Sequence, residues 1–207
     1  MWSTIWYYSV LTVESALGVF GVRLYEEPRY AIVERLPEGL EISRYQPRLA
    51  AAVVSPKPGP EGRNEAFRLL FAYIAGANTT AARVAMTAPV LVEEPTRIAM
   101  TAPVQIDASG PGTRMLFFLP AEFTAQTAPV PKDPRVKILL QEAETVAVIR
   151  FSGTVTDVSV RKRALMQSLG GTTWKPSGEP YYMGYDPPFT IPFLKRNEVA
   201  VAVTKAP

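Results

Sequence analysis

The distribution of apolar residues along the chain predicts short strands before a first helix. Alternating or β-branched apolar stretches indicate strands near residues 30–36, 40–45 and 48–54. A loop over residues 55–62, rich in proline and glycine, ends this group of strands.

Apolar residues then recur at helical spacing. Asn64 is the expected N-cap of this helix, and Gly76 ends the pattern. The predicted helix is amphipathic, with a large apolar face that consists of Ala66, Phe67, Leu70, Phe71 and Ile74.

An eight-residue phrase occurs twice, at residues 83–90 and again at 97–104, and both copies contain Met-Thr-Ala-Pro-Val. We expect each copy to form a strand, with Met86 and Met100 at equivalent positions on one face. Because proline lacks an amide donor, each copy should mark a strand edge or a bulge.

The second half of the chain repeats the order of strands, helix and strands. Asp157 can cap a second helix, which Gly170 and Gly171 close. The predicted strands are 114–119, 136–141, 145–151, 179–185 and 198–203. Two such units, paired around a pseudo-twofold axis, predict an α+β fold with a mixed sheet or distorted barrel and two helices.

The composition restricts the possible catalytic groups and ligands more than it restricts the possible fold. The chain has 207 residues, 47% of them hydrophobic, which predicts a single globular domain. It contains no cysteine and no histidine, so Ser-His and Cys-His catalysis and the usual histidine ligand of haem are excluded. The net charge of +3 comes from scattered basic residues, and we expect no nucleic-acid partner.

Residues 1–24 form an apolar leader ahead of the domain predicted for residues 25–207. Glu14 and several hydroxyl residues dilute its apolar character, and no positive charge precedes Arg23. A docked or interfacial helix therefore fits residues 1–22 better than a signal peptide, and a membrane anchor is the main alternative. We expect a cytoplasmic protein that can associate with a membrane.

The doubled phrase, with Gly184-Tyr-Asp-Pro-Pro188 and Lys195-Arg-Asn-Glu-Val199 near the end, resembles the SOUL haem-binding protein family. The resemblance runs from about Tyr25 to about Val203. It implies the fold of gyrase-inhibitor-like effector-binding domains and non-covalent binding of haem or another tetrapyrrole, without a generally assigned reaction. A carrier, a buffer or a sensor of haem are the roles that we expect.

The resemblance further implies a hydrophobic cleft between the first helix and the loop before the final strand. Carried onto this chain, the cleft is lined by Phe67, Leu70, Phe71, Ile74, Met86, Met100, Tyr185, Phe189, Ile191 and Phe193. Ordinary core packing is the competing interpretation for each of these residues.

A haem needs cations near its propionates, whereas an axial ligand for its iron is optional. The candidate cations are Arg63, Arg68, Lys195 and Arg196. The family's basic residue just before the last proline of the loop is missing, because Thr190 and Ile191 occupy that stretch. Without histidine, an axial ligand would have to be Tyr73, Tyr181, Tyr182, Met183 or Tyr185, and binding without any ligand is an equal alternative.

Two other functions remain open. An effector-binding module for flat hydrophobic or cationic molecules would use Glu198 as an inward-pointing carboxylate, although this residue could equally be paired within its own turn. An enzyme would need carboxylates such as Glu179 and Glu198, or the bound haem itself, and we identify no catalytic residue.

Overall fold

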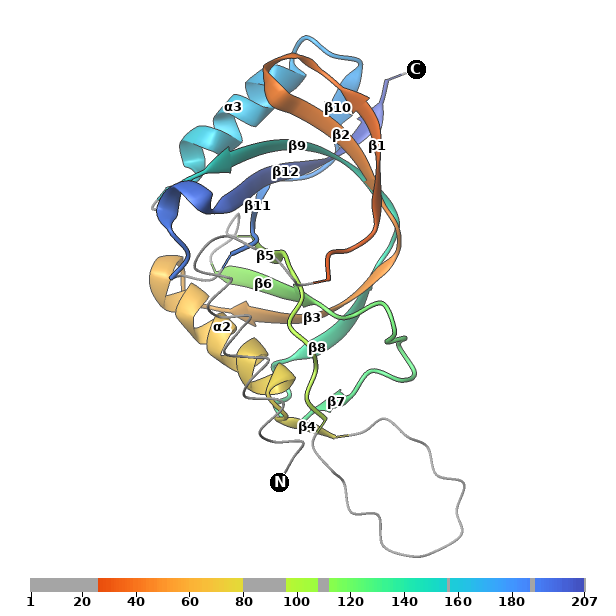
Figure 1. Ribbon diagram of the computed structural model, residues 1–207, viewed down its shortest axis with the longest axis vertical. Coiled ribbons are helices and arrows are strands. Elements are labelled where there is room, and N and C mark those ends of the chain that lie inside the picture. The colour runs from red at the N-terminus through yellow and green to blue at the C-terminus, as the bar shows by residue number, and fades with distance from the viewer. Residues whose placement is uncertain (1–25, 80–95, 108–111, 156, 187–188, 207) are drawn as a thin grey trace, which may run out of the picture.

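The computed structural model describes residues 26–79, 96–107, 112–155, 157–186 and 189–206 (Figure 1). These residues form helices α2 (Gly59–Ile74) and α3 (Ser159–Leu169) and the short 3-10 helices η1 (Pro37–Gly39) and η2 (Pro192–Leu194). The strands are β1 (Tyr30–Arg35), β2 (Leu40–Tyr45), β3 (Arg48–Ser55), β4 (Asn78–Thr79), β5 (Val104–Asp107), β6 (Thr113–Phe118), β7 (Val130–Pro131), β8 (Lys137–Gln141), β9 (Glu144–Ser152), β10 (Trp174–Pro176), β11 (Tyr181–Gly184) and β12 (Arg196–Lys205).

One large sheet has the order β1-β2-β9-β12-β11-β5-β6-β3-β8, with β10 added on β12, and all its strand pairs are antiparallel. The sheet curls into an incomplete barrel, and α2 and α3 lie on its outer side (Figure 1). The predicted α+β fold with a distorted barrel is therefore confirmed.

The two halves of the chain have the same connectivity. The first half follows the order β2-β3-α2-β5-β6, and its last strand, β6, pairs with both β3 and β5. The second half follows the order β8-β9-α3-β11-β12, and its last strand, β12, pairs with both β9 and β11. The equivalent strands β5 and β11 pair with each other, and β2 and β8 each pair with a strand of the opposite half. The halves consequently share one sheet.

Side-chain alternation separates two layers of the core. Outward residues of β3 and β6, such as Val53 and Phe117, pack with Leu70 under α2, while Val199 and Val201 pack with α3. Inward residues fill the barrel in two clusters: Tyr45, Ala102, Val146, Val148, Tyr181, Met183, Tyr185 and Ala200, and Ala50, Ala52, Leu116 and Phe118. These inward side chains thus lie on the face of the sheet opposite to α2 and α3 (Figure 1).

The first helix begins earlier than the sequence predicts. It starts at Gly59 after the N-cap Pro58, so the predicted N-cap, Asn64, lies inside it. A proline in the first turn lacks only an amide that the helix leaves unpaired in any case. A Cβ atom at Gly62 would lie 1.9 Å from the carbonyl oxygen of Lys57, so glycine lets the first turn approach the preceding chain. The helix ends as predicted, and Gly76 has a φ of 117°.

The prediction of a strand is wrong for most of the second copy of the doubled phrase. The first copy lies outside the described residues, and the second copy is extended only from Val104, where β5 begins. Before that point the Ile98 amide donates to the Ile74 carbonyl, and the Thr101 hydroxyl donates to the Phe118 carbonyl. These bonds hold the segment against α2 and β6. In addition, Pro103 has no amide hydrogen to donate to a neighbouring strand, which disfavours a strand at this point.

The leader over residues 1–25 lies outside the described residues, and its predicted helix stays a prediction. Within the described part of the chain, neither helix combines the length and apolar character needed to cross a membrane.

Candidate functional site

Two phenylalanines of α2 form an exposed aromatic row, which we define as Phe67 and Phe71. Phe67 is 41% exposed and Phe71 is 45% exposed. Their rings stack with centroids 5.9 Å apart and planes 14° apart, and Phe67 also meets the edge of Phe117 on β6 at 5.6 Å. Adjacent aromatic rings that stay exposed are typical of binding surfaces.

The rest of the predicted helix face is core. Leu70 and Ile74 of α2 are buried in the core between the helix and the sheet. Tyr73 of α2 is buried with them, and its hydroxyl donates to the Pro129 carbonyl at 2.9 Å. The apolar face predicted from the sequence therefore divides into a buried part and the exposed aromatic row.

Two arginines lie on α2 next to the aromatic row. Arg63 and Phe67 are four residues apart, as are Phe67 and Phe71, so the three positions share one side of the helix. Arg63 is half-buried, and Arg68 is exposed. The charge of Arg63 lowers the pKa of Tyr182 on β11, against the larger effect of burial, which raises that pKa to about 12.

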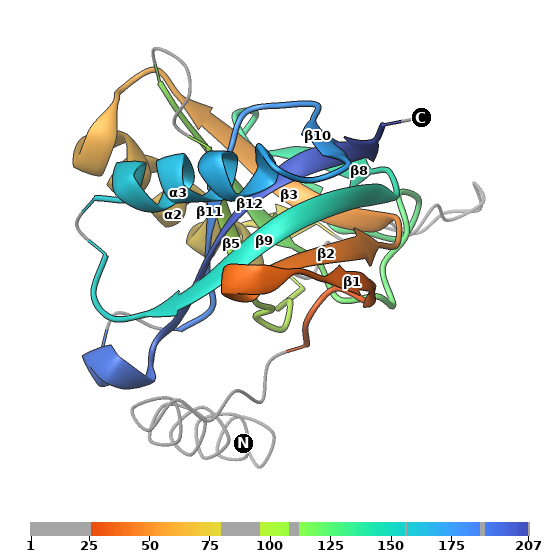
Figure 2. The same ribbon diagram turned by 90° about the horizontal axis from the view of Figure 1, so that it is seen from above.

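The loop before β12 also exposes aromatic rings. Phe189 is 56% exposed and Phe193 is 72% exposed, whereas Ile191 and Lys195 are half-buried. In Figure 2, the blue turn of η2, which carries Phe193, lies apart from α2 and beyond the end of β9. The described part of the loop therefore adds exposed aromatic surface, but η2 does not stand against the aromatic row.

Of the two methionines predicted from the doubled phrase, Met100 is 39% exposed, and Met86 lies outside the described residues.

Arg196 and Glu198 belong to a buried ion-pair network inside the barrel. Glu198 is 2% exposed and accepts hydrogen bonds from Arg196 Nε at 2.9 Å, Arg150 Nε at 3.0 Å and the Tyr185 hydroxyl at 2.7 Å. Arg196 also pairs with Glu27 at 3.0 Å, and its guanidinium carbon lies 3.8 Å from the centre of the Tyr185 ring. Arg196 and Glu198, two of the charged residues that the sequence offered for ligand binding, are thus paired within the protein.

The candidate axial ligands are likewise buried or hydrogen-bonded within the protein. Tyr181 and Met183 are buried on the inner face of β11, and Tyr185 is buried directly after its end. The Tyr182 hydroxyl donates to Asn197 Oδ1 at 2.6 Å. Burial raises the pKa of Tyr73 to about 12 and raises that of Tyr181 and Tyr185 well above the usual value. At neutral pH these side chains are phenols, which bind ferric iron far less well than tyrosinate.

The buried tyrosines predict a loss of stability at alkaline pH. Because the folded-state pKa values of Tyr45 and Tyr73 are raised to about 12, the folded protein keeps protons that the unfolded chain releases near pH 10. We expect the free energy of unfolding to fall steadily from pH 10 to pH 12, as measured by urea titration at each pH. A Tyr73→Phe variant should show a shallower fall, and an unchanged slope would contradict the assignment.

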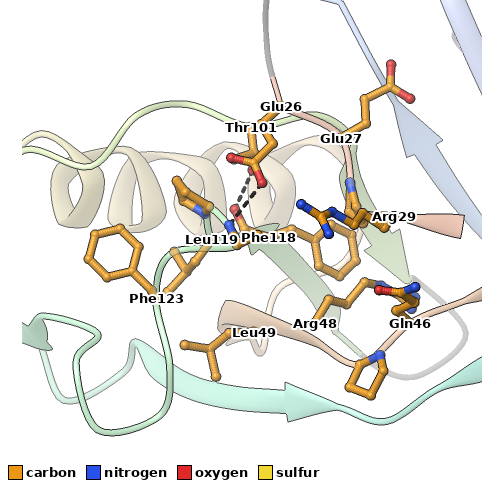
Figure 3. A pocket seen from close by; sticks show the side chains of 14 residues that line it. Glu26, Glu27, Arg29, Gln46, Arg48, Leu49, Thr101, Phe118, Leu119 and Phe123 are labelled. Atoms are coloured by element: carbon orange, nitrogen blue, oxygen red, sulfur yellow. Dashed lines mark hydrogen bonds between the residues drawn. The ribbon is translucent and has the colours of Figure 1, made fainter.

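A cavity that the sequence did not reveal lies where β2 turns into β3 and where β6 ends. Its volume is about 330 Å³, and Figure 3 shows Glu26, Arg29, Gln46, Arg48 and Phe118 around it. The signal in the sequence was a charged residue, Arg48, at an inward position of an otherwise apolar strand.

The fold defines an α+β protein with a curled antiparallel sheet, and the comparisons define its family. A family model described as "SOUL heme-binding protein" matches residues 25–202. The chain belongs to this family. It is similar to heme-binding protein 1 of Xenopus laevis, with 32% identity over 70% of this chain and 73% of the relative. Heme-binding protein 1 of Mus musculus is 30% identical over 73% of this chain and 77% of that protein.

The fold also occurs among solved structures of low sequence similarity. The crystal structure of the EcmrR C-terminal domain has a TM-score of 0.52 and 10% identity, and the match covers 86% of this chain and 99% of that domain. At this identity the likeness concerns the fold alone.

Proposed function

We propose that this protein binds haem or a related tetrapyrrole reversibly and without a covalent bond, as a carrier, buffer or sensor. The observation that carries the proposal is the exposed, stacked pair Phe67 and Phe71 on α2, in a chain of a family whose relatives in frog and mouse are called heme-binding proteins.

The aromatic row and its arginines match the two kinds of surface on a porphyrin. A porphyrin is a flat apolar disc that carries two propionates at one edge, so it needs an apolar contact and nearby cations. Phe67 and Phe71 provide the apolar contact, and Arg63 and Arg68 provide positive charge on the same helix. We leave Arg196 out of this site, because Glu27 and Glu198 already pair with it.

The proposed complex needs no bond from the protein to iron. The chain has no histidine or cysteine, and the candidate tyrosines are buried phenols with raised pKa values. Contact between the disc and apolar side chains should therefore supply most of the affinity, at about 25 cal/mol per Å² of apolar surface removed from water.

We expect hemin and metal-free protoporphyrin to bind within tenfold of each other, because the metal adds little. Titration of the protein with each porphyrin, followed by absorption for hemin and by fluorescence for the metal-free ring, measures the two dissociation constants. Hemin that binds more than a hundredfold more tightly would show a strong bond to iron. No saturable binding of either ring would reject the function itself.

The contacts of Glu198 weigh against the alternative of a cationic effector in the barrel. An inward carboxylate could hold a cation, but Arg150 and Arg196 already balance the charge of Glu198. A cationic ligand would have to displace one of these arginines. Within the described residues, no cluster of three or more acidic side chains could hold a metal ion, and we propose no catalytic role.

A further inference from the structure

The cavity beside Arg48 is separate from the aromatic row of α2. The segment before β1, the turn between β2 and β3, and the chain after β6 line it, and its volume is about 330 Å³. This volume lies near the lower end of the roughly 300 to 1,000 Å³ that is usual for small-molecule pockets. Figure 3 shows both apolar side chains, such as Leu49 and Phe123, and charged ones around it.

Arg48 is the buried charge of this cavity. Its residue is 8% exposed, and its guanidinium carbon lies 4.4 Å from the centre of the Tyr45 ring and 4.9 Å from that of Phe118. Nη2 forms an ion pair with Glu144. Among the described residues, Nε and Nη1 have no hydrogen-bond partner. A buried guanidinium with unpaired N–H groups is costly unless something accepts those hydrogen bonds.

Three more buried polar atoms make no hydrogen bond within the described part of the chain: the Tyr181 hydroxyl, Gln105 Oε1 and Arg196 Nη2, of which Arg196 Nη2 is ion-paired with Glu198 at 2.8 Å. Gln105 stands directly opposite Met183 and Leu116, two inward residues, and so shares their face. Tyr181 lies on this inner face as well; burial raises its pKa, and Glu144 and Arg48 are near enough to shift that pKa further. Of these residues Arg48 lines the cavity, and its unpaired nitrogens are donors, so a matching ligand would bring acceptor oxygens.

The other charges around the cavity leave room for an anion. Glu27 is paired with Arg196, and Glu26 accepts a hydrogen bond from the Ala121 amide at 3.0 Å. Arg29 also lines the cavity and offsets the charge of Glu26. Arg48 is thus the buried arginine that lines this cavity and still has unpaired donors.

We propose that this cavity binds a small monocarboxylate with a compact apolar or aromatic body, and that Arg48 receives the carboxylate. The unpaired Nε–H of Arg48 donates a charge-assisted hydrogen bond to one carboxylate oxygen. Leu49, Phe118, Leu119 and Phe123 contact the apolar body. This site is independent of haem binding on α2.

Benzoate and benzamide are a matched pair of probes for this site, because they share a ring and nearly the same shape but only benzoate carries a charge. We expect calorimetric titration of the full-length protein at pH 7 to show saturable binding of benzoate, at least tenfold tighter than that of benzamide. Equal binding of the two, or no benzoate binding at millimolar concentration, would overturn the proposal.

Variants locate the binding. The double variant R48Q/E144Q removes both members of the ion pair without leaving a buried charge, and it should weaken benzoate binding by roughly ten- to a hundredfold, as expected for charge-assisted hydrogen bonds. The matched control is R161Q, which removes an exposed positive charge on α3 and should leave the affinity unchanged. Unchanged binding in R48Q/E144Q would overturn the assignment.

A second measurement decides the matter if R48Q/E144Q fails to fold. In the wild-type protein, the assigned Nε–H resonance of Arg48 should shift with benzoate and not with benzamide, and a resonance that does not move would reject the site. Hemin at saturation should leave the benzoate affinity unchanged, whereas competition would place benzoate on the porphyrin surface. Benzoate binding without hemin binding would reject the proposed function alone.

Discussion

Replacing Glu198 with alanine should lower the free energy of unfolding by about 3 to 5 kcal/mol, the usual cost of removing one partner from a buried ion pair. The substitution leaves Arg196, whose side chain is only 14% exposed, paired with Glu27 but without Glu198, and it removes the acceptor of the Tyr185 hydroxyl. Arg150 is more exposed and can be rehydrated, so most of the loss should come from Arg196 and Tyr185. Urea unfolding, followed by circular dichroism, measures the change.

Glu142→Ala is the control for Glu198→Ala, because Glu142 is exposed and its removal should change stability by less than about 0.5 kcal/mol. If the two variants unfold at the same urea concentration, the network around Glu198 does not stabilise the barrel. The folded fraction of Glu198→Ala should still bind hemin, since the aromatic row lies on α2. Loss of hemin binding from that folded fraction would instead place the ligand inside the barrel.

The sequence predicted most strands because their side chains alternate between two different surroundings. The strand predicted at 198–203 lies within β12, where Val199 and Val201 pack outward under α3 and Glu198 and Ala200 point into the barrel. The prediction failed for the second copy of the doubled phrase, where apolar spacing alone resembled a strand. There the hydrogen bonds of Ile98 with α2 and of Thr101 with β6 determine the conformation. These are tertiary contacts, which the local sequence pattern does not show.

The sequence predicted which residues belong to the candidate site better than it predicted how those residues are arranged. Phe67 and Leu70 look alike in the pattern of the helix, yet the position of β6 leaves one exposed and the other buried. Likewise, the sequence pattern predicted that Glu198 could point inward. It could not predict the pairing of Glu198 with Arg150, which is 48 residues away along the chain. Arg48 was missed because its unpaired nitrogens depend on what surrounds it in three dimensions.

Replacing both Phe67 and Phe71 with alanine should weaken hemin binding by about 2 to 4 kcal/mol, roughly 30- to 1,000-fold. The two rings are the stacked, exposed surface on α2, so their removal takes away the apolar contact that we propose for the disc. The affinity follows from absorption titration of each variant with hemin. Phe71→Ala alone should cost about 1 to 3 kcal/mol of binding and little stability, because Phe71 is exposed.

Two single variants separate loss of the ligand contact from loss of packing. Leu169 is buried against the sheet on α3, so Leu169→Ala should destabilise the protein by about 2 to 5 kcal/mol while its folded fraction binds hemin normally. Phe193 is 72% exposed, and η2 lies apart from α2, so Phe193→Ala tests the loop separately. A loss of affinity in Phe193→Ala that matches the loss in Phe71→Ala would mean that the loop closes on α2 when porphyrin binds. Full affinity in the double variant of Phe67 and Phe71, with an intact fold, would remove α2 from the binding site, since no other change in that variant could compensate for the lost rings.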